Sequence, residues 1–134
     1  MQHWIFISSI KTFRMNEWLA QHDFVEYYQR NKVCVNDIVY LYTTAPICRI
    51  EYKMIVEKIN IPLNQIVVDS AYSVRKEPVK YNSDAKFFRL KLLKKTNNPN
   101  LHLDCLRNYG LKSSMQSNLK VSGELLEYIE EQFR

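Results

Sequence analysis

Residues 33–56, VCVNDIVYLYTTAPICRIEYKMIV, carry the strongest secondary-structure signals in this chain. At their centre, Ile38–Tyr42 is a run of β-branched and aromatic residues, which is typical of a buried strand. The Asn36-Asp37 pair before it indicates a turn, and the proline four residues after it ends the strand because proline cannot donate to a sheet. Apolar and polar side chains then alternate over Ile50–Ile59, so the two strands are predicted to pair as a hairpin.

The flanking sequence adds one early strand, one late strand and several short helices. Trp4–Ile7 is a continuous apolar run that predicts a buried strand, and residues 16–29 have an irregular apolar spacing that predicts short helices. Residues 87–93 alternate as a further strand, residues 101–109 suggest a short helix, and an apolar stripe after Ser122 predicts a closing helix. The predicted fold class is α+β, a small mixed sheet or barrel with helices packed around it.

Length and composition indicate one globular domain over residues 1–134. The 134 residues are 46% hydrophobic and 25% charged, with two glycines and four prolines, so neither a linker nor a low-complexity segment is indicated. Two glycines cannot build a phosphate-cradling glycine loop, and no common hydrolase or metalloprotease motif is present. We therefore predict that the chain is not an enzyme and uses no cofactor.

The cysteines and the N-terminus bear on location. Cys34, Cys48 and Cys105 are an odd number without paired spacing, and the three histidines are scattered, so neither a disulfide framework nor a metal site is predicted. We expect the cysteines to be mostly buried in a reducing compartment. No apolar run is long enough to span a membrane, and the N-terminus lacks the pattern of a secretory signal. A cytoplasmic protein without membrane contact is predicted.

Positive charge is concentrated in the third quarter of the chain. The net charge is +5, yet residues 71–120 contain eleven Lys or Arg and three Asp or Glu, while residues 1–70 are balanced and the last fourteen are acidic. A local positive field attracts polyanions, because phosphates release counterions when lysine or arginine neutralises them. Nucleic acid is one reading of this stretch, and a solvated lysine-rich surface is the other.

The block V-x-V-N-D-I-V-Y-L-Y-x-x-A-P-x-x-R-I-x-Y-K-M-x-V, residues 33–56, resembles the middle of the EVE family of PUA-like domains. Trp4-Ile5-Phe6 resembles the opening strand of that family, and residues 106–129 resemble its closing segment. Two departures stand out. Asn36 occupies a position where glycine is usual, which asparagine tolerates because it accepts left-handed backbone angles, and Tyr27 replaces a tryptophan.

The resemblance implies a reader of modified bases, related to YTH-type domains, that holds modified cytosine or methylated adenine in an aromatic pocket. A base removed from its stack must recover a few kcal/mol from stacking and edge hydrogen bonds. The predicted pocket residues are the aromatic side chains near the expected strand ends and the hydroxyl residues beside them: Trp4, Ser8, Ser9, Trp18, Tyr27, Tyr28, Tyr42, Thr43 and Tyr52. For several of these a role in the core is the alternative, and Thr44 is a further polar candidate.

Phosphate contacts are predicted for a set of cations that lies mostly in the basic stretch: Arg14, Arg49, Arg75, Lys76, Lys80, Lys86 and Lys112. Arg49 has a second reading, as a structural partner of Asp37 across the hairpin. The predicted partner is DNA or RNA, which the sequence does not separate. We expect no nuclease within 134 residues, so any cleavage is expected to belong to a separate effector nuclease.

Two other functions stay open at this point. The same scaffold could serve as a small-ligand or protein-interaction domain on which the basic stretch is incidental, and an enzyme of an unfamiliar kind is the third reading. Added salt separates nucleic-acid binding from the small-ligand or protein-interaction reading, since nucleic-acid binding weakens steeply with salt and binding at an apolar site does not.

Overall fold

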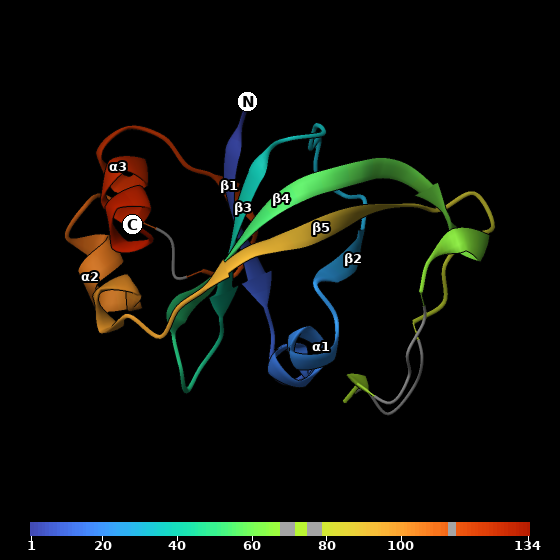
Figure 1. The fold of residues 1–134 in the computed structure, drawn as a ribbon, viewed down its shortest axis with the longest axis horizontal. Coiled ribbons are helices and arrows are strands. Elements are labelled where there is room, and N and C mark those ends of the chain that lie inside the picture. The colour runs from blue at the N-terminus through green and yellow to red at the C-terminus, as the bar shows by residue number, and fades with distance from the viewer. Residues whose placement is uncertain (68–71, 75–78, 113–114) are drawn as a thin grey trace.

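One mixed sheet of six strands organises the protein, in the order β2-β5-β4-β3-β1-β6 (Figure 1). The structure is a computed structural model that describes residues 1–67, 72–74, 79–112 and 115–134. The strands are β1 (His3–Ser8), β2 (Phe24–Tyr28), β3 (Ile38–Thr43), β4 (Arg49–Pro62), β5 (Lys86–Lys95) and β6 (Leu119–Lys120). The helices are α1 (Met15–Gln21), α2 (Leu103–Arg107) and α3 (Gly123–Gln132), with single 3-10 turns η1 (Leu63–Gln65) and η3 (Pro99–Leu101).

The sheet is open. Strands β2 and β6 lie at its two edges, and within the described part of the chain they do not pair with each other. The predicted α+β class is therefore confirmed, and the sheet rather than the barrel is the form observed.

The middle block folds as predicted. Strands β3 and β4 pair antiparallel as a hairpin, with Val39 opposite Met54. Asn36 turns the chain into β3 with φ of 75°, a left-handed angle that asparagine accepts more readily than most residues. Strand β1 pairs in parallel with β3, which sets Ser8 directly opposite Thr43 at the ends of the two strands.

The segment after α1 corrects the sequence-based prediction. Short helices were expected over residues 16–29, but only α1 forms, and residues Phe24–Tyr28 are strand β2. His22 is already extended, with φ −135° and ψ 150°, and Val25 then lies opposite Leu90 of β5. The aromatic and β-branched residues of β2 favour a strand. Pairing with the long strand β5 therefore prevails over the predicted helix.

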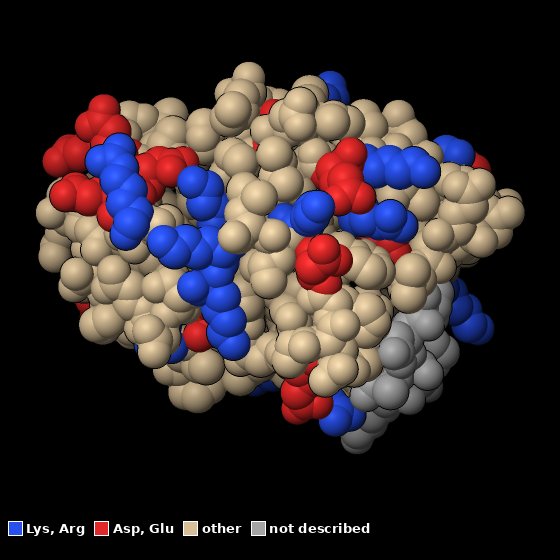
Figure 2. All heavy atoms as spheres, viewed as in Figure 1, with Lys and Arg blue, Asp and Glu red and all other residues tan. Residues whose placement is uncertain are grey.

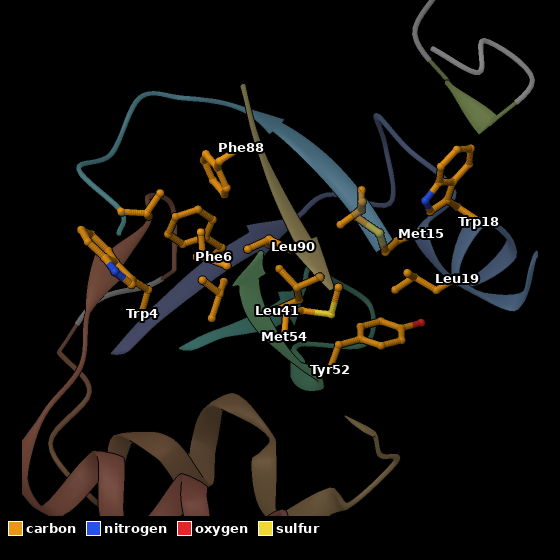
Figure 3. Packing of buried hydrophobic residues seen from close by; sticks show 14 residues of the cluster. Trp4, Phe6, Met15, Trp18, Leu19, Leu41, Tyr52, Met54, Phe88 and Leu90 are labelled. Atoms are coloured by element: carbon orange, nitrogen blue, oxygen red, sulfur yellow. The ribbon is translucent and has the colours of Figure 1, made fainter. Parts of the chain in front are cut away.

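Hydrophobic cores lie on both faces of the sheet, because successive side chains of β1 and β3 point to opposite sides. Helix α1 covers one face (Figure 3), and α2 and α3 cover the other. The α1-side core consists of Trp4, Phe6, Met15, Trp18, Leu19, Val25, Val33, Val39, Leu41, Tyr52, Met54, Val56, Phe88 and Leu90. The α3-side core consists of Ile5, Ile38, Tyr40, Tyr42, Ile50, Leu101, Leu106, Leu111, Met115, Val121, Leu125, Ile129 and Phe133.

Asp37 ties the N-terminus to the sheet. Its carboxylate is buried and accepts hydrogen bonds from the backbone N–H of Gln2 at 2.8 Å and of Cys34 at 2.9 Å. The indole Nε1 of Trp4 donates to it at 3.2 Å, and the side-chain amide of Gln2 at 3.1 Å. Trp4 therefore belongs to the core. Its predicted place in a base pocket is wrong, because its ring is buried and its N–H is already used.

These hydrogen bonds control the titration of Asp37. Burial raises the pKa of the carboxyl group, but the bonds from Gln2, Cys34 and Trp4 outweigh burial and hold the pKa below its usual value of 3.8. Because the pKa is lower in the folded state, the stabilisation is complete above the ordinary pKa of aspartate. It is lost as the pH falls through the lower pKa of the folded state.

Two other expectations bear on the surface. Cys34 is exposed, and Cys48 and Cys105 are half-buried, so the prediction of mostly buried cysteines is wrong; all three thiols are free. Among the described residues no helix has the length and apolar character needed to span a membrane.

We predict that Asp37→Asn lowers the free energy of unfolding by about 3 kcal/mol, since its amide NH2 would face donors that lose their acceptor. Urea denaturation at neutral pH measures this. Asp84→Asn, at an exposed loop position, is the matched control and should change stability by less than about 0.5 kcal/mol. A loss at position 37 no larger than that of the control would contradict the role assigned to Asp37.

Candidate functional site

A cavity of about 170 Å³ opens where β1 and β3 end beside the start of α1. Parallel strands bring their carboxyl ends to the same edge of a sheet, which is where α/β-type proteins commonly bind ligands. We call this the β1–α1 cavity. Its lining residues are Ser8, Ile10, Phe13, Arg14, Met15, Asn16, Glu17 and Thr43.

A tight loop between β1 and α1 shapes the cavity. The carbonyl oxygen of Ser9 accepts hydrogen bonds from the N–H groups of Thr12 and Phe13, both at 3.1 Å. The N–H of Thr44 donates to the Ser8 carbonyl at 3.2 Å, and Thr44 Oγ1 accepts from the N–H of Ile10 at 3.3 Å. Ser9 and Thr44, both predicted to touch a ligand, hold this loop, Ser9 through its backbone carbonyl and Thr44 through its hydroxyl.

A buried ionic group lies behind Thr43. Thr43 Oγ1 donates to Glu51 Oε1 at 2.7 Å, and the Arg49 guanidinium donates to Glu51 Oε2 at 3.0 Å. Glu51 is only 5% exposed. It is the extra residue of a β-bulge, because Leu41 pairs with Tyr52 while the next residue of β3 pairs with Ile50. Bulges re-aim side chains and are frequent next to functional sites.

Positive charge lies at the mouth of the cavity. Arg14 forms an ion pair with Glu17 at 3.6 Å, but both side chains are about half exposed or more. Such an exposed pair contributes little to stability, so Arg14 can leave Glu17 to contact a phosphate. At the same end of the sheet, Lys95 Nζ lies 5.8 Å from the ring centroid of Tyr52. Figure 2 shows Lys and Arg side chains spread over the face that carries β4 and β5, with Asp and Glu gathered over α3 and a few more among the cations.

Two tyrosine hydroxyls of the α1-side core are buried, those of Tyr27 and Tyr52, and that of Tyr52 has no hydrogen-bond partner among the described residues. Burial raises the pKa of Tyr27, and the neighbouring Ser8 side chain offsets part of that shift. Burial, and to a smaller extent the negative charge of Glu51, raises the pKa of Tyr52 to about 12. Both hydroxyls therefore stay protonated at neutral pH.

The predicted aromatic pocket does not fit the structure, because its residues lie on two faces and at two ends of the sheet. Tyr42 is in the α3-side core, on the opposite face from the cavity. Tyr28 lies at the far end of β2, against Tyr81. Trp18 is buried, and its ring stacks on His22 with centroids 3.7 Å apart. Figure 3 shows the Tyr52 ring beside Met54 and Leu41, and the Trp18 ring on helix α1 at the edge of the cluster.

The predicted cations separate in the same way. Arg14 lines the cavity, and Arg49 braces Glu51 rather than Asp37, which corrects the structural reading of that residue. Lys86, at the other end of β5, is nine residues from Lys95, or roughly 30 Å along an extended strand. Lys86 therefore lies at the opposite end of the β4–β5 pair from Tyr52 and Lys95. Lys80 is exposed in the segment leading to that far end, and Arg75 and Lys76 lie outside the described residues.

Lys112 lies at a second depression of about 410 Å³, between the end of α2, β6 and the start of α3. Although larger, this depression is rimmed by exposed side chains such as Tyr109, Ser122 and Glu124. The β1–α1 cavity instead has the buried side chains of Ser8 and Thr43 in its wall. Buried polar groups must find partners, so the smaller cavity is the better candidate for a specific ligand.

Sequence reasoning missed Phe13, Met15 and Glu51. Phe13 and Met15 flank the predicted Arg14, and an aromatic residue next to a cation just before a helix was the available signal. Glu51 was read as the polar side of an alternating strand, and the bulge that turns it inward leaves no mark in that pattern. Within the described residues, no group of three or more His, Cys, Asp or Glu could hold a metal ion.

Comparisons with known proteins identify the fold. No protein-family model matches this sequence, and no curated protein matches it. Solved structures do match over nearly the whole chain. The ASCH protein of Zymomonas mobilis superposes with a TM-score of 0.69 and 11% identity, covering 99% of this chain and 96% of that one. A hypothetical protein of Leishmania major gives 0.67 and 18% identity, covering 100% and 98%.

Human THYN1, solved in complex with DNA containing 5-methylcytosine, gives a TM-score of 0.66 at 10% identity and covers 100% of this chain and 98% of that one. At such low identities the likeness establishes a shared fold. The chain has the α+β fold of the ASCH and THYN1 structures, so the PUA-like fold implied by the resemblance is confirmed.

We predict that Tyr52→Phe leaves the free energy of unfolding unchanged or raises it by up to about 1 kcal/mol, because the hydroxyl it removes has no partner in the described part of the chain. Tyr40→Phe is the matched comparison, since the Tyr40 hydroxyl donates to Glu130 and its loss should cost about 1–2 kcal/mol. Thermal or urea unfolding of both variants measures the difference. A Tyr52→Phe variant as destabilised as Tyr40→Phe would contradict the unpaired state of this hydroxyl.

Proposed function

We propose that this protein binds nucleic acid and receives one unstacked base in the β1–α1 cavity. The observation that supports it most is the mixture of groups around one small hollow. The cavity combines an aromatic ring, Phe13, a cation at the mouth, Arg14, and the buried hydroxyl residues Ser8 and Thr43. A flipped base needs a stacking surface, hydrogen bonds at its edge and neutralisation of its phosphate.

The size of the cavity suits one small planar group. Its volume of about 170 Å³ is below the roughly 300–1,000 Å³ of sites for drug-sized ligands. Stacking a base on one aromatic ring is worth about 1–3 kcal/mol, which offsets the few kcal/mol that unstacking costs. In this proposal Phe13 supplies the ring that the predicted tryptophan and tyrosine residues do not.

A modified base fits this lining better than an unmodified one. Ile10, Phe13 and Met15 form an apolar part of the wall, against which a methyl group could pack. Burying one methyl group is worth about 0.8 kcal/mol, or a factor of about four in affinity. The DNA in the THYN1 complex carries 5-methylcytosine. We therefore propose 5-methylcytosine as the first ligand to test, and methylated adenine as the second.

The electrostatics agree with a nucleic-acid partner. The chain has a net charge of +5, and β5 carries Lys86, Arg89, Lys91, Lys94 and Lys95 with no acidic residue. Cations of this density attract a phosphate backbone and release its counterions. Binding without catalysis is part of the proposal, and any cleavage linked to binding would come from a separate nuclease.

We predict that Phe13→Leu weakens binding of a short single-stranded oligonucleotide containing 5-methylcytosine by roughly tenfold or more, because leucine keeps most of the bulk but cannot stack. Fluorescence anisotropy measures the affinity. Tyr28→Leu, at an aromatic residue on the far end of the sheet, is the control and should bind as the native protein does. Equal affinity of Phe13→Leu and the native protein would exclude Phe13 as the stacking residue.

We predict that Arg14→Ala weakens binding of modified and unmodified oligonucleotides by similar factors and lowers the slope of log Kd against log salt by about one. Lys86→Ala removes the same charge at the start of β5, roughly 30 Å along the strand from Lys95, and should leave the slope for a short oligonucleotide unchanged. Titrations at several salt concentrations give both slopes. If Lys86→Ala changes the slope and Arg14→Ala does not, the nucleic acid binds elsewhere on the surface.

A further inference from the structure

The buried Glu51 carboxylate behind the cavity determines whether the Thr43 hydroxyl can donate a hydrogen bond to a ligand or only accept one. Glu51 forms an ion pair with Arg49 at 3.0 Å and is therefore ionised, so both of its oxygens only accept hydrogen bonds. Thr43 Oγ1 lies 2.7 Å from the other carboxylate oxygen, in a buried pair, and must be the donor. A hydroxyl group has one hydrogen, and Thr43 donates it to Glu51 in this hydrogen bond. What Thr43 can offer a ligand is a lone pair.

This arrangement resists reversal. If Thr43 turned its hydrogen toward a ligand, Glu51 Oε1 would lose its hydrogen bond while the residue is only 5% exposed, and a buried charged acceptor without a partner is costly. Arg49 does not compensate, because it is bonded to the other oxygen. The β-bulge at Glu51 fixes where the carboxylate emerges from the sheet.

We infer that Glu51, acting through Thr43, selects bases that carry an exocyclic amino group over bases that carry a carbonyl at the same position. This inference rests on the proposed function. An amino group, as at C4 of cytosine or C6 of adenine, donates to the Thr43 lone pair. The carbonyl of thymine or hypoxanthine places its own lone pairs against that of Thr43, and both acceptors are left unpaired. Thr43 contacts the base, and Glu51 is a positioning residue.

The test compares 5-methylcytosine with thymine at one position of a short single-stranded oligonucleotide. The two bases share the pyrimidine ring and the 5-methyl group, and they differ in the amino or carbonyl group at C4 and in the protonation of N3. The native protein should bind the 5-methylcytosine strand roughly tenfold more tightly. Adenine and hypoxanthine, which differ in the same sense, should give the same preference.

Glu51→Gln should reverse or abolish that preference while keeping the shape of the side chain. Arg49 can only donate, so the glutamine carbonyl oxygen turns to Arg49 and its NH2 group to Thr43. Thr43 then accepts from glutamine, and its hydrogen is free to point at the base. Thr43→Val removes the hydroxyl and should bring the two affinities to within about twofold. Glu57→Gln, at an exposed position of β4, is the control and should retain the native ratio.

The outcomes separate the two proposals. If the native protein binds none of these strands, the proposed function fails. If it binds both pyrimidine strands equally, base binding stands and the selection by Thr43 is overturned. A native preference that Thr43→Val abolishes but a folded Glu51→Gln retains would overturn the role of Glu51. Should Glu51→Gln not fold, the native and Thr43→Val ratios still decide whether the Thr43 hydroxyl selects the base.

Discussion

The parallel pairing of β1 with β3 is the constraint on which the candidate site depends. This pairing sets Ser8 opposite Thr43 at the carboxyl ends of the two strands. The loop to α1 begins at the same end of the sheet. An antiparallel arrangement would have put the end of one strand beside the start of the other. The two hydroxyl residues, the Phe13 ring and the Arg14 cation would then have no common hollow. The Asp37 hydrogen bonds to Gln2 and Trp4 hold the beginning of β1 in that register.

The ionic group of Glu51, Arg49 and Thr43 has no evident value as a stabiliser. Removing two charges from water costs as much as or more than their mutual attraction returns, and apolar residues at such positions are often at least as stable. Its location directly behind a cavity residue, on a bulge that turns the carboxylate inward, is better understood as orienting a hydroxyl group. The Ser8 side chain, in the cavity wall, also contacts the buried hydroxyl of Tyr27.

Local patterns in the sequence were sufficient for the elements with clear periodicity. The β3–β4 hairpin, strand β5 and helix α3 follow from alternation, from a turn at Asn36 and from an apolar stripe. Residues Phe24–Tyr28 were misread because the partner that makes them a strand, β5, lies about sixty residues later in the chain.

The actual positions of the aromatic side chains could not be predicted for a related reason. Whether a tyrosine faces α1, α3 or solvent depends on register and on the bulge at Glu51, and neither is visible in composition. Ser8 and Thr43 were identified because they stand at strand ends, where topology brings residues together, and Arg14 was identified only by its charge. Tyr42, one residue from Thr43, points to the other face.

Mapping of backbone amide shifts by NMR, during titration with a single-stranded oligonucleotide containing 5-methylcytosine, tests the central claim most directly. The β1–α1 cavity as the base-binding site requires the largest changes at residues 8–17 and at Thr43, with smaller changes along β5. Changes confined to the depression around Lys112 and Ser122, with residues 8–17 unmoved, would contradict it.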